Sequence, residues 1–198
     1  MGMTYTKMRP TAPAEIQMNA GVILTEFVPA TGLVDTSKIL ASTTGGISVT
    51  AVPSYVDFGD DIDNCPKNMK EFKDIESIEV KASATALTIT ADLAKFLAGA
   101  ADIETVESAD HSVTKIVPRQ TLLNADFQDL WIVGDRGKGG QGGIAVHLMN
   151  ALNTGGFSMQ TADKGKGQFA MDITGHYEMA NPEDVPYEIY IIEDEQTP

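Results

Sequence analysis

The chain has 198 residues, of which 42% are hydrophobic, so it is long enough to bury a sizeable core without disulfides. Its 28 acidic and 14 basic residues give a formal charge of −14, which disfavours tight binding to nucleic acid or to an anionic membrane. Cys65 is the single cysteine, so an intramolecular disulfide is excluded and the chain suits a reducing compartment or one where redox conditions do not matter. We find no signal-peptide pattern and no run of 18 apolar residues, and expect neither secretion by a signal peptide nor a membrane span.

The N-terminal part predicts an arm followed by two strands. Residues 1–16 have no hydrophobic period and contain two prolines, which is typical of an arm. Residues 21–27 have the composition of a strand, and residues 45–52 alternate apolar with polar side chains. Such alternation predicts a strand with one buried face.

Residues 53–77 predict a long loop, because they have no clean period and contain two prolines and several acids. An acidic cluster (Asp57, Asp60, Asp61, Asp63) lacks the spacing of a calcium loop and favours a solvated segment. Five apolar residues among the charges could anchor the loop on a partner: Val56, Phe58, Ile62, Met69 and Phe72. We expect the segment from Pro53 to Asp74 to be disordered in the free subunit and ordered on assembly. The alternative is that it packs on its own subunit.

The middle of the chain predicts an irregular strand and one helix. Apolar residues are even-numbered at Ile78 and Val80 but odd-numbered at Leu87 and Ile89, so we expect a bulge or a change of sheet near residues 82–86. A helix is predicted next, because Leu93, Phe96, Leu97 and Ala100 fall at helical spacing. Thr90 or Asp92 would cap its N-terminus, and Gly99 would end it. Residues 113–117 predict a further strand.

The glycine-rich stretch "GDRGKGGQGG" (residues 134–143) raises the question of a phosphate-binding loop. The Walker pattern fails, because Ile132 occupies the position of its first glycine and Gly139 follows Lys138. Strand-like residues 130–133 and 144–149 flank the stretch, with the partly apolar Trp131 in the first of them. A β-hairpin is therefore the better interpretation, and Trp131 is expected in the core.

The C-terminal part predicts a long hairpin and a last strand. Residues 157–161 alternate, a Lys-Gly-Lys-Gly turn follows, and Phe169, Met171, Ile173 and Tyr177 share one face. Residues 187–192 predict the last strand, before an acidic tail at residues 193–198. The fold class is mainly β: one sandwich or barrel-like domain over residues 1–198 with one flanking α-helix and a long loop.

The sequence offers no catalytic or metal-binding constellation. Its three histidines (His111, His147, His176) are far apart, and no pair has ligand spacing. Asp172, His176 and Glu178 lie at even spacing on one predicted strand face, and a hydrolytic site could use these three side chains. However, the solvated face of any long strand has the same pattern of polar residues. No nucleophile motif accompanies them, so we predict neither an enzyme nor a bound cofactor.

Three stretches carry a resemblance to a known family: "DFQDLWIVGDR" (residues 126–136), "GGIAVHLMNALNTGGFSMQTADKGKGQFAMDITGHYEM" (142–179) and "VPYEIYII" (185–192). The stretch "NAGVILTEFVPATG" (19–32) is also similar. The chain resembles the major tail proteins, or tail tube proteins, of long-tailed siphophage-type bacteriophages.

That resemblance implies a β-sandwich subunit that forms hexameric rings, which stack into the tail tube and conduct the genome. It implies partners: other copies of the chain, the tape-measure protein and the tail initiator and terminator proteins. Double-stranded DNA would pass without specific binding, and no membrane partner is implied. The chain would be assembled in the host cytoplasm and reside in the virion. Residues 53–77 would reach a neighbouring subunit, and Asp172, Thr174 and His176 are candidates to face the lumen.

Two other interpretations stay open. The chain could be the tube subunit of a contractile tail or injection device, which shares this fold. It could also be a monomeric β-sandwich binding module, although its loops contain Gly, Lys and Asp where such a module would expose aromatic residues.

Overall fold

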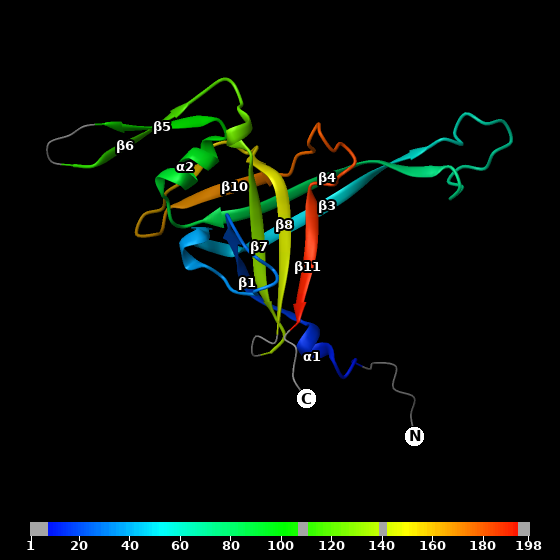
Figure 1. Cartoon of the computed structure of the whole chain (residues 1–198), viewed down its shortest axis with the longest axis horizontal. Coiled ribbons are helices and arrows are strands. Elements are labelled where there is room, and N and C mark those ends of the chain that lie inside the picture. The colour runs from blue at the N-terminus through cyan, green and yellow to red at the C-terminus, as the bar shows by residue number, and fades with distance from the viewer. Residues whose placement is uncertain (1–7, 107–110, 139–141, 194–198) are drawn as a thin grey trace.

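A computed structural model describes residues 8–106, 111–138 and 142–193. Within them, one antiparallel sheet of nine strands folds into two layers, which meet where β8 pairs with both β7 and β10 (Figure 1). The first layer contains β2 (Ile39–Ala41), β1 (Gln17–Leu24), β7 (Gln128–Arg136), β8 (Gly142–Asn153) and β11 (Tyr187–Glu193). The second contains β3 (Thr43–Asp57), β4 (Lys73–Ala86), β10 (Gln168–Thr174) and β9 (Met159–Gln160). The predicted mainly β fold is confirmed.

Smaller elements lie around these layers. A separate hairpin of β5 (Ala101–Val106) and β6 (Val113–Pro118) projects from the body on the side opposite to the long β3–β4 hairpin (Figure 1). The helical elements are α1 (Ala12–Glu15), α2 (Ala91–Ala98) and the short 3₁₀ turns η1 (Thr36–Lys38) and η2 (Asn124–Asp126). In the part of the chain that the structure describes, no helix is both long and apolar enough to cross a bilayer.

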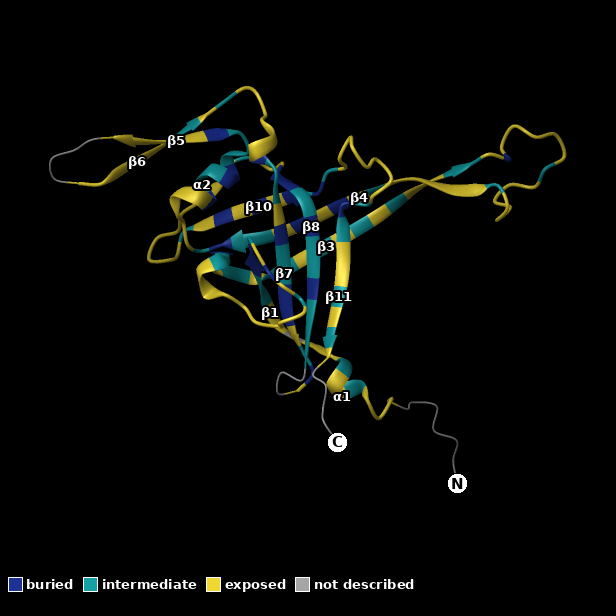
Figure 2. Ribbon diagram, viewed as in Figure 1, coloured by how far each residue is buried: buried dark blue, intermediate teal, exposed yellow. Residues whose placement is uncertain are grey.

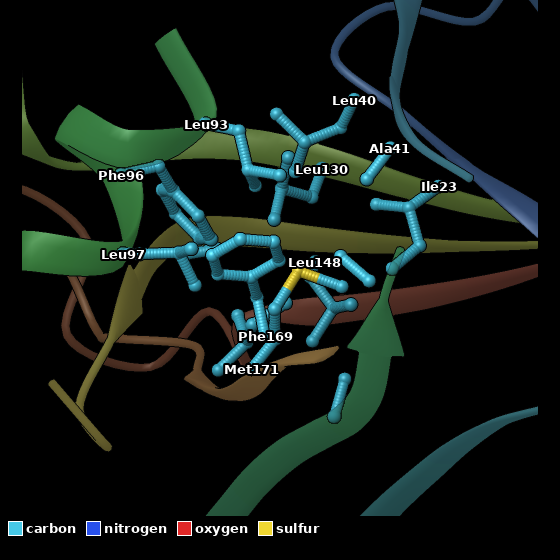
Figure 3. Close-up of a cluster of buried hydrophobic side chains, with 14 of the residues drawn as sticks. Ile23, Leu40, Ala41, Leu93, Phe96, Leu97, Leu130, Leu148, Phe169 and Met171 are labelled. Atoms are coloured by element: carbon cyan, nitrogen blue, oxygen red, sulfur yellow. The ribbon is translucent and has the colours of Figure 1, made fainter. Parts of the chain in front are cut away.

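The main core lies between the two layers and beneath α2. Ile23, Leu130 and Leu148 come from the first layer, and Met171 and Ile173 come from β10 in the second; all five are nearly or fully inaccessible to solvent. Figure 3 shows side chains of both layers meeting those of α2. The two layers are therefore held together by apolar burial, as in a β-sandwich.

The predicted helix is confirmed, and its ends have the expected chemistry. Thr90 caps the N-terminus of α2, because its hydroxyl accepts a hydrogen bond from the Leu93 amide at 3.2 Å. Gly99 ends the helix at a positive φ of 78°. Leu93, Phe96 and Leu97 face the core, whereas Ala100 lies beyond the helix.

Asn153 links this helix to both layers. Its side chain, 3% exposed, donates to the backbone oxygen of Leu97 at 2.8 Å and to that of Gly156 at 3.0 Å. Its Oδ1 accepts from the Asp172 amide at 2.9 Å. Because the amide is almost completely satisfied, its burial carries little penalty.

Two strand predictions need correction. The first strand runs over β1 and not over residues 21–27; Gly21, with φ 74°, lies at a bulge where a Cβ would be 2.8 Å from the Val133 oxygen. β4 keeps one buried face from Val80 to Ala86, so it contains no bulge there. The irregularity lies in the facing strand β3, where the register shifts between Thr44 and Ile47. The odd-numbered apolar residues come after β4 has ended.

The predicted loop over residues 53–77 was too long. β3 extends to Asp57 and β4 begins at Lys73, so only residues 58–72 lie outside strands. The hydrophobic pattern did not reveal these parts of β3 and β4, because the hairpin projects from the body. Both of its faces meet water there, so no buried face imposes an alternation of apolar and polar residues. The prediction of a long C-terminal hairpin was also wrong, because it overestimated the paired strands. β9 has only two residues, and β10 pairs mainly with β4.

Candidate assembly surfaces

The outer edge of β3 has unpaired backbone groups. β3 pairs with β4 along one side, and within the described residues no strand pairs with its other side. Residues 43–56 contain no charged side chain. A long uncharged edge is a template for another strand, and monomeric proteins usually block such edges with charges or by covering them. Here Pro53 and two register shifts are the only such devices in the strand.

The outer edge of β11 is also unpaired in the part of the chain that the structure describes. β11 pairs with β8 over seven residues, and its other side has no strand partner. Ile189 and Ile191 are 58% and 64% exposed although they lie in a regular strand. Ile189 faces Val146 across the strands and Ile191 faces Ile144. Directly opposed residues share a face, so a continuous apolar surface borders the open edge.

We call this surface the β11 patch; it consists of Ile132, Ile144, Val146, Ile189 and Ile191. Ile132 faces Val146 on the other side of β8 and extends the patch toward β7. Ile132 packs against the main core, while β11 is largely exposed (Figure 2). The patch is therefore a part of the inner sheet face that the second layer leaves uncovered.

The β3–β4 hairpin forms an arm that projects far from the body, with residues 58–72 as the arm tip (Figure 1). Asp57 organises the tip: its carboxylate accepts from the Gly59 amide at 2.9 Å and from the Asn68 amide at 3.0 Å. The Phe58 amide donates to the Phe72 oxygen at 2.9 Å. The tip thus has hydrogen bonds of its own.

The five predicted assembly residues divide into two groups. Phe58, Ile62 and Met69 are 63%, 48% and 36% exposed, whereas Val56 and Phe72 are half-buried within the arm. Phe72 lies against Gly59, where an added Cβ would approach its ring to 3.1 Å. Phe58, Ile62 and Met69 are therefore the residues that a partner could cover, and their role in assembly stays a prediction.

The outer face of the second layer is rich in hydroxyl groups. Ser48, Ser83 and Asp172 form one cross-strand row, and Thr50, Lys81 and Thr174 form the next. These rows line a shallow hollow of about 500 Å³. Lys81 is paired with Glu79 at 2.6 Å. This face is polar and nearly neutral, in contrast to the chain as a whole.

The three candidate lumen residues do not lie together. Asp172 and Thr174 share the hydroxyl-rich face, where the Thr174 and Thr154 hydroxyls are 2.9 Å apart. His176 lies beyond the end of β10 in a separate hollow with Phe127 and Tyr177. Its Nδ1 is 3.1 Å from the Asn150 backbone oxygen, and its ring meets that of Phe127 edge-on. The chain leaves the strand at Gly175, where a side chain would approach the Pro186 oxygen to 3.2 Å.

The alternation of Asp172, His176 and Glu178 therefore does not continue on one strand face. Tyr177 has a structural role: its hydroxyl lies 2.9 Å from the Ile78 amide and 3.2 Å from the Ile78 oxygen. It continues the hydrogen bonding of β4 after β10 has ended.

An aromatic cluster on the other face of the first layer was missed by the sequence analysis. His147 stacks on Trp131 with ring centroids 4.0 Å apart, and its ring nitrogens lie 3.3 Å from Asp129 and 3.8 Å from Glu188. A hydrogen bond to Glu188 raises the pKa of Tyr190 above its ordinary value. Trp131, predicted to be in the core, is only partly buried in a smaller apolar cluster.

A buried ion pair fixes the base of the β5–β6 hairpin. Arg119 contacts Asp126 at 2.6 Å and Asp102 at 2.9 Å, and the Asp126 side chain is 1% exposed. Burial alone would raise the pKa of Asp126, but the hydrogen bond from the Leu123 amide and Arg119 hold that pKa below its ordinary value. Burial would lower the pKa of Arg119, yet the hydrogen bond to Asp126 and the charge of Asp102 hold it above the usual value.

The glycine-rich stretch joins β7 and β8 in a hairpin, as predicted, although residues 139–141 lie outside the described residues. Among the described residues, no group of three His, Cys, Asp or Glu side chains could hold a metal ion. The predicted acidic tail lies outside the described residues after Glu193.

No protein-family model matches the chain, and no curated protein matches it. Among solved structures, it is similar to a chain described as "Virion of native gene transfer agent (GTA) particle". The two are 10% identical, the match covers 80% of this chain and 92% of that chain, and the TM-score is 0.36. A likeness this distant carries no conclusion about function.

Proposed function

We propose that the chain is a structural subunit of a phage-like virion, which assembles head to tail into closed rings that stack into a tail tube. The observation that carries this proposal is the pair of open strand edges, β3 and β11, on one chain. A strand of one copy that pairs with a different strand of the next gives a heterologous contact, and such contacts form a closed ring when the rotation between successive copies divides a full turn. The sequence resemblance to tail tube proteins supports the same architecture and implies six copies per ring.

The chemistry of the two edges is complementary. β3 has no charge before Asp57, and β11 borders the exposed apolar β11 patch. Pairing would satisfy the open amides and carbonyls of both strands and would cover Ile189 and Ile191. In this arrangement the protein has a structural role and neither a catalytic site nor a cofactor.

The hydroxyl-rich face of the second layer is the surface that we assign to the lumen. It bears Asp172 and Thr174 but not His176. This face exposes hydroxyl groups, and the one lysine among the described residues that line it, Lys81, is already paired with an acid, so it offers little attraction for phosphate. Double-stranded DNA would pass along such a wall without specific binding. Tape-measure, initiator and terminator proteins are the further partners that this role implies.

Removal of the arm tip separates ring formation from stacking. In the test variant, residues 58–72 are replaced by Asn-Gly, so that the paired residues Asp57 and Lys73 flank a two-residue hairpin turn. We expect a folded subunit with wild-type circular dichroism that forms rings but no tubes in negative-stain micrographs. Tubes of normal length from this variant would contradict the role of the arm in stacking.

A further inference from the structure

Residues 157–167, which we call the β9 turn, form an exposed apolar and basic segment on an acidic protein. Phe157 and Met159 are 55% and 56% exposed. Met159 lies in β9, which pairs with β10 along one side and has no strand on its other side within the described residues. The segment has the features of an interaction surface: open backbone groups next to large apolar side chains.

The charge of the β9 turn indicates its partner. Lys164 and Lys166 are exposed, and neither takes part in an ion pair among the residues that the structure describes. Asp163 is the only acid in the turn, so the segment is net positive on a chain of formal charge −14. A partner of matching chemistry would present apolar side chains surrounded by acids.

The arm tip of another copy of this chain has that chemistry. It exposes Phe58 and Ile62, and it contains four acidic residues against two lysines. Asp61 and Asp63 have no ion pair within the described residues, and Asp60 has only a contact of 3.8 Å with Lys67. Asp61 and Asp63 are therefore available to a partner.

The two segments also lie toward opposite ends of the long axis of the molecule. Figure 1 shows the arm tip at one end and the turn before β10 on the other side of the body, and both are exposed in Figure 2. Segments so placed cannot meet within one subunit, but they can meet between successive copies. A head-to-tail contact that does not close into a ring repeats from copy to copy along one direction, as the stacking of rings requires.

We propose that the β9 turn is the receiving site for the arm tip of a neighbouring copy, with Phe157 and Met159 covered by Phe58 and Ile62. Lys164 and Lys166 face Asp61 and Asp63 in this contact. The inference rests on the proposed function, and it names the surface that each arm engages.

Charge reversal tests the contact. We expect Lys164→Glu/Lys166→Glu to need about a tenfold or higher protein concentration to form tubes, because two attractive contacts become repulsive. The matched control, Lys115→Glu/Lys138→Glu, changes the net charge by the same amount at two exposed lysines outside both segments and should leave tube formation unimpaired. Adding Asp61→Lys/Asp63→Lys to the first variant reverses both sides and should restore tubes.

The outcomes separate this inference from the proposed function. If the wild type forms tubes and Lys164→Glu/Lys166→Glu forms them equally well, or if the reversed pair does not restore them, the receiving site is wrong while the tube role stands. If the wild type forms no assembly under any condition, both are wrong. A second measurement is independent of charge: in a Cys65→Ser background, Ile62→Cys with Met159→Cys should form disulfide-linked oligomers on oxidation, and neither single cysteine should give more than dimers.

Discussion

Replacing Ile189 and Ile191 with threonine tests whether the edge of β11 is an interface. Both isoleucines keep about 60% of their surface exposed in the isolated chain, at 58% and 64%. Complete burial of an isoleucine side chain contributes about 1.5–3 kcal/mol, so covering the exposed part contributes about 1–2 kcal/mol for each residue. Threonine keeps the β-branch and one methyl group, so it retains part of this burial. The double substitution should therefore weaken each interface by roughly 2 kcal/mol of association free energy. We expect the midpoint of assembly to move to about 30-fold higher concentration.

The assay has two parts. Sedimentation velocity over a concentration series measures assembly, and urea unfolding of the dilute subunit measures folding. Because the two side chains are mostly exposed in the subunit, its free energy of unfolding should change by less than about 0.5 kcal/mol per substitution. The matched control is Val106→Thr/Val113→Thr, which changes two valines, 42% and 40% exposed, that face each other in the β5–β6 hairpin. Equal assembly of the threonine variant and the wild type would refute β11 as the interface.

Three further predictions concern folding and the channel wall. Because the pKa of Asp126 is lowered in the folded chain, its ion pair with Arg119 stabilises the fold above the ordinary carboxyl pKa of about 4 and this contribution is lost as pH falls further. Asp126→Asn should therefore destabilise the subunit at pH 7, and urea unfolding should show the difference from wild type narrowing below about pH 4. Gly21→Ala should destabilise by about 1 kcal/mol or more in thermal unfolding, since it places a Cβ against Val133 at a positive φ; an unchanged melting temperature would contradict the bulge. Asp172→Lys should leave tube assembly intact and slow genome ejection in a reconstituted tail, whereas ejection at the normal rate would place the lumen on another face.

Sequence patterns predicted the elements that have one dry and one wet face. β10 alternates because Phe169, Met171 and Ile173 enter the core while their neighbours meet solvent, and α2 shows both its cap and its glycine end. These elements carry their own boundary signals, so local sequence was sufficient.

The candidate assembly surfaces were harder to predict from the sequence. The arm was interpreted as a loop because β3 and β4 leave the body and lose their buried face. Which strands end with an open edge depends on the pairing order, and alternation along a strand does not encode its neighbours. His176 was grouped with Asp172 because their spacing is even, but the chain turns at Gly175 and separates them. The isoleucines of β11 can be seen in the sequence, but the sequence does not indicate that the second layer leaves them exposed.

The central claim is that this chain assembles through its open strand edges into stacked rings. Negative-stain electron microscopy of the purified wild-type protein, over a concentration series that starts from the dilute subunit, tests it most directly. The account predicts closed rings and, at higher concentration, hollow tubes of uniform diameter built from them. A protein that stays monomeric at every concentration and ionic strength, with a tail initiator complex present as well, would contradict it.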